Sequence, residues 1–202
     1  MVKIKIIFIV HNIATIDCLV PLIRLMFLHS RFEVVVFSIP KHFPGDNGFN
    51  GEDVVHNALE DFGIAHRRLN FKDDFDGLKI LKKLKPDIIF RQSPWDADIP
   101  EAYSTHNLNF CQLCYIPYYG VHITDAGDLD FIHENQDFHR ACWKIFIDKD
   151  TEHYYKKIGY HHWSKVVVTG SPKYEYLADI LKSKKSINTR KRIIWDGHHI
   201  MQ

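Results

Sequence analysis

The stretch Ile4–Val10, which reads Ile-Lys-Ile-Ile-Phe-Ile-Val, is the segment of this sequence that decides the fold class. It is almost entirely apolar and β-branched, as a strand is when both faces of its sheet are covered. Similar runs recur along the chain and alternate with amphipathic stretches; they predict strands at 32–39, 65–69, 88–90, 110–116, 143–147 and 166–169. These repeated strand–helix–strand units predict an α/β fold, a Rossmann-like parallel sheet with helices on both faces.

The segments between the strands carry helix signals. Asp17 can cap a helix that runs to about His29 with one apolar face, and Gly63 can end another over 52–62. Asp98 can cap a helix after the loop 92–100. Further helices are expected at 75–84, 130–140, 150–158 and 173–181.

A basic, aperiodic stretch at 182–192 marks the expected domain boundary. One Rossmann-like domain is expected over residues 1–182. Residues 183–202 then form a linker and the first strand, from Arg192 to Trp195, of a second domain that this chain does not contain.

Composition sets limits on the function. Lys plus Arg is 26 and Asp plus Glu is 25 among 202 residues, a formal net charge of +1. A nucleic-acid-binding domain usually has a basic excess, so no nucleic-acid partner is expected. No segment approaches the ~20 apolar residues of a membrane span, and no signal peptide is recognisable. Four cysteines without a secretion signal indicate reduced thiols in the cytoplasm.

Ligands of parallel α/β sheets bind at the carboxyl ends of the strands, so the residues that follow each strand are the candidates for a site. The expected substrate-binding residues are His11, Gln92, Asp96, Tyr118, Gly120, Gly170, Ser171 and His199. Hydroxyl and imidazole groups there can hydrogen-bond a polyol or sugar. The expected catalytic residues are His122 and His198, because imidazole can accept or donate a proton near neutral pH. Each segment has a simpler alternative, an ordinary connecting loop or a packed aromatic turn.

Other site types are not supported. The first strand is not followed by G-x-G-x-x-G, and no P-loop motif occurs, so no dinucleotide or other cofactor is expected. His133 and His139 are spaced two residues too widely for an H-E-x-x-H zinc motif. Cys111 and Cys114 fall in a predicted strand whose alternation sends them to opposite faces. We therefore expect no metal.

Three segments taken together resemble one family. They are Lys85–Pro94, Cys114–Gly120 and Val166–Tyr174. They look like the amino-terminal half of CDP-glycerol glycerophosphotransferase-like proteins, which belong with the GT-B glycosyltransferases. Residues 192–199 are similar to the strand and Pro-His-His-type loop that open the nucleotide-binding half, with Gly197 in place of proline. The resemblance covers most of the chain, from about Lys3 to His199.

The resemblance implies two Rossmann-like domains, of which the first faces a polymer or glycolipid acceptor and the second binds a CDP- or UDP-activated donor. It implies transfer of glycerol phosphate or a sugar in teichoic acid or capsular polysaccharide synthesis, without an obligatory metal. Peripheral attachment to the inner face of the cell membrane fits this family, although no strongly amphipathic basic helix demands it.

Two departures limit this inference. The loop Pro117–Gly120 has tyrosine where the teichoic acid polymerases carry a catalytic histidine, and His122 is close but not aligned. The donor half is also missing, so this chain alone is expected to be incomplete as an enzyme. The alternatives are a non-catalytic sugar- or partner-binding lobe and a relative of the sugar-nucleotide epimerases.

Overall fold

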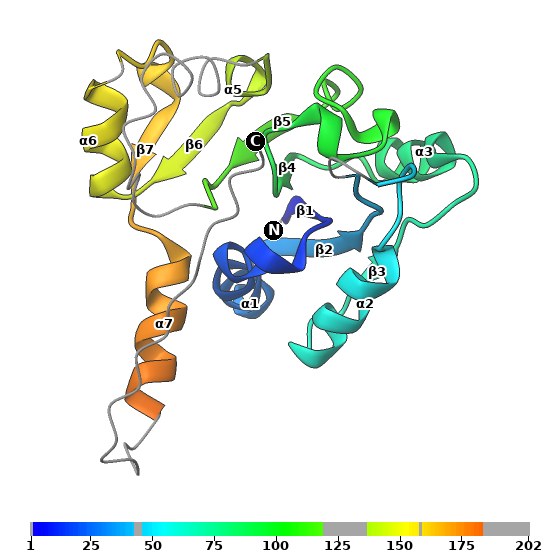
Figure 1. Ribbon diagram of the computed structural model, residues 1–202, viewed down its shortest axis with the longest axis horizontal. Helices are drawn as coiled ribbons and strands as arrows, with labels where there is room; N and C mark the ends of the chain where they lie inside the picture. Colours follow the sequence, from blue (N-terminus) through cyan, green and yellow to red (C-terminus); the bar gives the residue numbers. More distant parts are fainter. Residues whose placement is uncertain (1, 43–45, 119–136, 158, 184–202) are drawn as a thin grey trace.

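The computed structural model describes residues 2–42, 46–118, 137–157 and 159–183. Its centre is one sheet of seven parallel strands in the order β3-β2-β1-β4-β5-β6-β7 (Figure 1). The strands are β1 (Ile4–Val10), β2 (Phe32–Ser38), β3 (Arg67–Arg68), β4 (Ile88–Arg91), β5 (Gln112–Tyr115), β6 (Lys144–Ile147) and β7 (Val166–Val168). The predicted Rossmann-like parallel α/β sheet is therefore confirmed.

The strand order contains one reversal of direction across the sheet. The chain steps outward from β1 through β2 to β3, returns to place β4 against the other side of β1, and continues to β7. Ile9 pairs with Arg91 at the carboxyl ends of β1 and β4. In open parallel sheets a ligand crevice forms outside the strand ends at this kind of reversal.

Helices cover both faces of the sheet (Figure 1). The α-helices are α1 (Val20–Leu28), α2 (Glu52–Asp61), α3 (Asp74–Leu84), α5 (Asp137–Ala141), α6 (Lys149–Lys157) and α7 (Pro172–Ser183). Short 3-10 helices are η1 (Ile13–Cys18), η2 (Asp96–Asp98), η3 (Glu101–Tyr103) and η4 (Trp163–Lys165). Ile7 and Ile9 of β1 enter the core under α3, α5 and α6, whereas Phe8 enters the core under α1 and α2. This double burial explains why β1 is apolar at nearly every position.

The first helix differs from its prediction. Asn12, not Asp17, is the capping residue, because its side chain accepts a hydrogen bond from the backbone N–H of Ala14 at the start of η1. Asp17 lies inside η1, and α1 begins only at Val20. Pro21 in the first turn fixes that start, since proline lacks the N–H that a helix interior requires.

Several boundaries also move. Asp98 caps no α-helix, because the two short 3-10 helices η2 and η3 follow β4 instead. The third strand shrinks from the predicted 65–69 to two residues. Lys182, expected in the linker, is the penultimate residue of α7. Cys111 and Cys114 contact the cores on opposite faces of the sheet, as predicted, and the four cysteines are free.

The edge strand β3 is short and charged. Arg68 donates hydrogen bonds to the buried carboxylate of Glu52 and to Asp53, both in the first turn of α2. Glu52 also accepts a hydrogen bond from Ser38 at the end of β2. These contacts join α2 to the sheet edge beside it.

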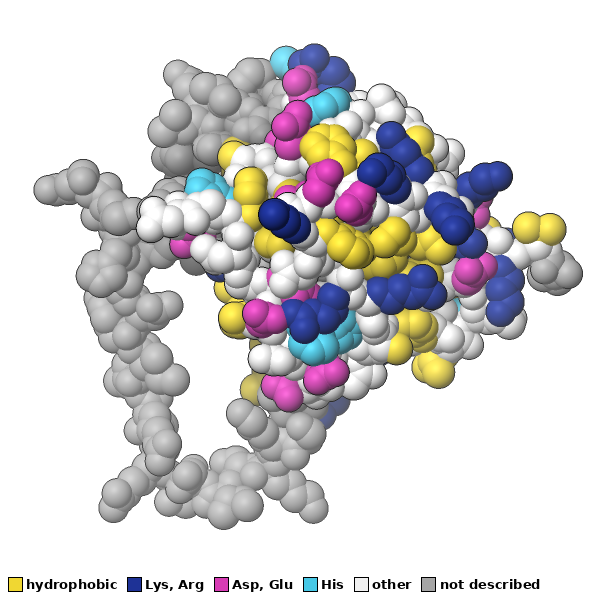
Figure 2. All heavy atoms as spheres, turned by 90° about the vertical axis from the view of Figure 1, so that its right-hand side faces the viewer, with side chains coloured by type: hydrophobic (Ala, Val, Ile, Leu, Met, Phe, Trp, Pro, Cys, Tyr) yellow, Lys and Arg dark blue, Asp and Glu magenta, His cyan; other side chains and the backbone are white. Residues whose placement is uncertain are grey.

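The side of the molecule on which both α2 and α3 are visible, beyond the β3 edge of the sheet, carries charged side chains of both signs (Figure 1, Figure 2). Figure 2 shows Lys and Arg side chains interspersed with Asp and Glu around a group of hydrophobic side chains. Helix α3 follows this pattern, with Asp74 and Asp76 in its first turn and Lys82 and Lys83 in its last. Within the described ranges, no helix is both long enough and apolar enough to cross a membrane.

Candidate functional site

A cavity of about 270 Å³ lies at the carboxyl ends of β1, β4 and β5. It is lined by His11, Asn12, Thr15, Ser93, Trp95, Asp98 and Tyr118. His11 directly follows β1, whereas Ser93 and Tyr118 follow β4 and β5 within a few residues. The cavity thus lies beside the reversal between β1 and β4, where the topology predicts a ligand crevice.

Gln92, the first residue after β4, is buried behind this cavity and holds its floor together. Its Oε1 accepts hydrogen bonds from the backbone N–H groups of His11 and Asn12, both at 2.9 Å. Its Nε2 donates to the Asn12 carbonyl at 2.7 Å and to Thr15 Oγ1 at 3.0 Å. These four bonds use the hydrogen-bonding capacity of the amide, so Gln92 positions the turn after β1 and has no polar atom left for a ligand.

His11 is the most deeply buried polar side chain that lines the cavity, with 1% of its surface exposed. Its Nδ1 is buried and has no hydrogen-bond partner among the described residues. Burial lowers the pKa of His11 to about 3, and the positive charges of Arg91 and Lys41 add to this effect. The imidazole is therefore neutral near pH 7. It can hydrogen-bond a ligand, but it is a weak proton acceptor.

The opposite wall comes from the loop after β4. Ser93 Oγ donates to Asp98 Oδ2 at 3.2 Å and accepts from the backbone N–H of Trp95 at 3.1 Å. The Trp95 indole N–H donates to the Tyr118 hydroxyl at 3.3 Å. Partial burial raises the pKa of Asp98, and the Ser93 hydrogen bond, Arg91, His42 and Lys41 oppose this rise. The wall therefore combines one carboxyl group with two aromatic rings.

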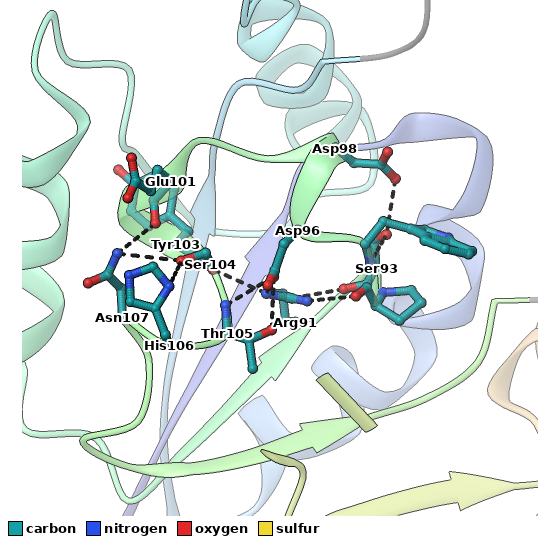
Figure 3. A network of polar contacts seen from close by, with 12 residues as sticks. Arg91, Ser93, Asp96, Asp98, Glu101, Tyr103, Ser104, Thr105, His106 and Asn107 are labelled. Carbon is teal, nitrogen blue, oxygen red and sulfur yellow. Dashed lines mark hydrogen bonds and ion pairs between the residues drawn. The ribbon is translucent and has the colours of Figure 1, made fainter. Parts of the chain in front are cut away.

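Arg91, the last residue of β4, supports this loop from inside the protein (Figure 3). Its guanidinium donates to the carbonyls of Ser93 at 2.9 Å, Pro94 at 3.0 Å and Tyr103 at 3.3 Å. It also donates to Asp96 Oδ1 at 2.5 Å. The guanidinium carbon Cζ lies over the Phe138 ring, 3.9 Å from the ring centroid. The loop is thus fixed around a buried cation.

Asp96 belongs to this internal network. Its Oδ1 also accepts from the Thr105 backbone N–H at 3.0 Å and from Thr105 Oγ1 at 2.8 Å. Its side chain is 44% exposed, but it is not among the residues that line the cavity. The observed contacts of Asp96 are those of a residue that positions the loop.

The structure separates the substrate-binding residues expected from the sequence. His11 and Tyr118 line the cavity, while Gln92 and Asp96 support it from outside. Gly170 and Ser171 line a different hollow of about 250 Å³ between α1 and the start of α7, together with Leu22, Leu25, Thr169 and Pro172. Gly120, His122, His198 and His199 lie outside the described residues, so their roles stay predictions.

Sequence reasoning missed most of the cavity wall. The sequence leaves two interpretations of the loop after β4 open, a loop that contacts substrate and an ordinary loop in which Asp98 caps the next helix. It does not select Trp95. The available signal was the position of both residues after a buried strand in a loop held by two prolines. Within the described part of the chain, no group of three or more His, Cys, Asp or Glu residues is arranged to hold a metal ion.

The parallel sheet with helices on both faces defines the class of fold, a Rossmann-like α/β domain of the kind found in GT-B-like structures. Solved structures with the same fold include the UDP-GlcNAc 2-epimerase of Neisseria meningitidis bound to UDP-GlcNAc, at 14% identity and a TM-score of 0.64; the match covers 91% of this chain and 51% of the epimerase. The UDP-N-acetylglucosamine 2-epimerase of Rickettsia bellii matches at 14% identity and a TM-score of 0.53; the match covers 90% of this chain and 49% of that epimerase.

A third similar structure is S. aureus MnaA with UDP, at 14% identity and a TM-score of 0.56; the match covers 91% of this chain and 49% of that protein. This chain therefore spans about half the length of the structures that it matches. At this level of identity the likeness shows the fold alone. No protein-family model matches the sequence, and no curated protein matches it.

Proposed function

We propose that this domain is the acceptor-side lobe of a GT-B-like enzyme that uses a nucleotide-activated donor. The observation that carries the proposal is the cavity at the reversal between β1 and β4, where a buried His11 with an unpartnered Nδ1 faces Trp95, Asp98 and Tyr118. The GT-B-like fold supports it, because three solved structures with this fold are sugar-nucleotide epimerases or hold UDP.

The finer proposal is transfer of glycerol phosphate or a sugar from a CDP- or UDP-linked donor to a cell-surface polymer, such as teichoic acid or capsular polysaccharide. The resemblance of Lys85–Pro94 and Val166–Tyr174 to the glycerophosphotransferase-like family supports this reaction. In such a transfer an acceptor hydroxyl attacks the donor phosphorus or sugar carbon, the bond from that atom to the nucleotide breaks with release of CMP or UDP, and a base removes the proton of the hydroxyl. His122 and His198 are the proposed catalytic residues. Residues 183–202 would lead into the donor-binding domain.

Isothermal titration of the 202-residue chain tests whether this domain binds the acceptor rather than the nucleotide-activated donor. We expect a synthetic oligomer of glycerol phosphate to bind, and CDP-glycerol to bind at least tenfold more weakly. His11→Ala should weaken binding of the oligomer, whereas the exposed His153→Ala on α6 should leave it unchanged. Tight binding of CDP-glycerol without binding of the oligomer would refute an acceptor-side assignment.

A second candidate, a sugar-nucleotide epimerase, is favoured by the solved structures with this fold. Product analysis with UDP-N-acetylglucosamine, using a protein that carries a second domain, separates the two reactions. An epimerase inverts a sugar stereocentre without an acceptor, whereas a transferase consumes the donor only when an acceptor is present. A third candidate, a non-catalytic binding lobe, predicts acceptor binding without either product.

A further inference from the structure

We propose that the cavity takes an uncharged, hydroxyl-bearing unit, a sugar ring or a glycerol group, and excludes phosphate, with His11 and Asp98 recognising its hydroxyls. This inference rests on the proposed function and specifies which part of the acceptor enters the site. A polymer acceptor would insert its terminal sugar or glycerol, and its phosphates would remain outside the cavity.

The unpartnered nitrogen of His11 indicates a hydrogen-bonding ligand. A buried polar atom without a partner has lost its water without gaining a hydrogen bond, so a group that pairs with it gains affinity. A neutral imidazole nitrogen is either a donor or an acceptor, depending on the tautomer. A hydroxyl can pair with either form because it donates one hydrogen bond and accepts others, whereas an ionised phosphodiester, such as those that link a glycerol phosphate polymer, can only accept.

The charge in the cavity lining disfavours an anion, and the positive charges of Arg91 and Lys41, which lower the pKa of His11, come from residues outside the lining. Asp98 is the charged side chain in the lining, and no Lys or Arg is among the described residues that line the cavity. The nearby Arg91 is fully buried and directs its N–H groups to three backbone carbonyls and Asp96. A phosphate in the cavity would therefore face a carboxylate without a direct cationic partner, and like charges in a partly buried site repel strongly.

The shape and the aromatic side chains fit a small polyol. A volume of about 270 Å³ lies just below the range of roughly 300–1,000 Å³ that is usual for sites of drug-sized ligands, which suits a single sugar or glycerol unit. The hydrogen bond from Trp95 to Tyr118 holds both rings in place. Their apolar surfaces can cover the C–H groups of such a unit, while His11 and Asp98 meet its hydroxyls.

The test uses the indole N–H resonance of Trp95, assigned with Trp95→Phe, in ¹H–¹⁵N spectra of the full chain. Glycerol and N-acetylglucosamine should shift this resonance saturably. Inorganic phosphate at the same concentrations and ionic strength should not. His11→Ala should weaken the response to the neutral compounds at least tenfold, and His153→Ala should match the wild type. Asp98→Asn retains an oxygen that can accept from Ser93, and it should allow phosphate to shift the resonance.

The outcomes separate this inference from the proposed function. If inorganic phosphate shifts the Trp95 resonance as strongly as the neutral compounds, or if the neutral compounds have no effect, the inference is wrong. An oligomer of glycerol phosphate that still binds in that case leaves the acceptor-side function standing. If neither the small compounds nor the oligomer binds, both fail. An unchanged response to phosphate in Asp98→Asn also contradicts the role given to the carboxylate.

Discussion

Replacing Gln92 by glutamate changes the NH2 group of a fully buried side-chain amide into an oxygen. The effect on stability follows from the four hydrogen bonds of that amide. Oε1 can still accept from His11 and Asn12. The second oxygen, however, replaces a nitrogen that donates to the Asn12 carbonyl at 2.7 Å and to Thr15 at 3.0 Å. Thr15 can turn its hydroxyl and donate. The Asn12 carbonyl cannot, so it repels the new oxygen unless that oxygen carries a proton.

The protonated form of the Gln92→Glu variant restores the lost hydrogen bond, so its carboxyl pKa in the folded state should rise well above the unfolded value of about 4.3. A raised carboxyl pKa gives stability that is complete below the unfolded pKa and is lost as the pH rises toward the folded pKa. Burial can raise such a pKa by about 3 units or more. The variant should then lose about 1.4 kcal/mol of unfolding free energy per pH unit, or roughly 3 kcal/mol between pH 5 and pH 7.

Urea unfolding followed by far-UV circular dichroism at pH 5, 6 and 7 measures this loss as a difference from wild type. Gln112→Glu is the matched control, because Gln112 is exposed on β5 and its substitution adds the same charge to the same sheet. The control should follow the wild type at each pH. If Gln92→Glu also runs parallel to wild type, the amide does not hold the turn after β1 as described.

Three further predictions concern stability. Gly77→Ala in α3 would place a Cβ 2.0 Å from the Tyr103 hydroxyl, so urea unfolding should show a loss of about 1–3 kcal/mol in the free energy of unfolding. Adding Tyr103→Phe should recover only part of this loss, because a ring carbon remains 3.1 Å from the new Cβ. Unchanged stability in Gly77→Ala would contradict the packing of α3 against Tyr103. Arg91→Met should cost about 3 kcal/mol or more by leaving buried carbonyls and Asp96 without their donor, and Asp96→Asn should cost less. Because burial lowers the pKa of His11 to about 3, its ring resonances should not titrate between pH 8 and pH 5. Its contribution to stability should fall by up to about 1.4 kcal/mol per unit below pH 6.5, where the unfolded chain takes up the proton, and His11→Gln should remove that part of the pH dependence.

The elements that the sequence predicts well are those whose side chains alone decide the structure. Strand β1 is recognisable because both of its faces are buried, which leaves little room for polar residues. Strand β3 is shorter than predicted, because only Arg67 and Arg68 pair with β2 and their exposed side chains form no buried apolar pattern that would mark its ends. The cap at Asn12 was missed because a more conspicuous candidate, Asp17, stands five residues later.

The candidate site was predictable in position but not in detail. The rule that ligands lie at strand ends selects the turns after β1, β4 and β5, and residues of these turns line the cavity. It cannot distinguish Asp98, which lines the cavity, from Gln92 and Asp96, whose contacts serve the fold. Gln92 pairs with residues about 80 positions away in the sequence, and such pairing leaves no local pattern.

The edges of the sheet carry a consequence for self-association. A parallel sheet ends in strands with unpaired backbone groups, to which a strand from another molecule can add. At one end of the described sheet, β3 offers only two residues, both arginines. The guanidinium of Arg68 is held at this edge by the carboxylates of Glu52 and Asp53 in α2. At the other end, β7 is three valines, and Val168 is 41% exposed. Strand addition is therefore limited at β3, which offers only two residues, and we expect aggregation to begin at β7.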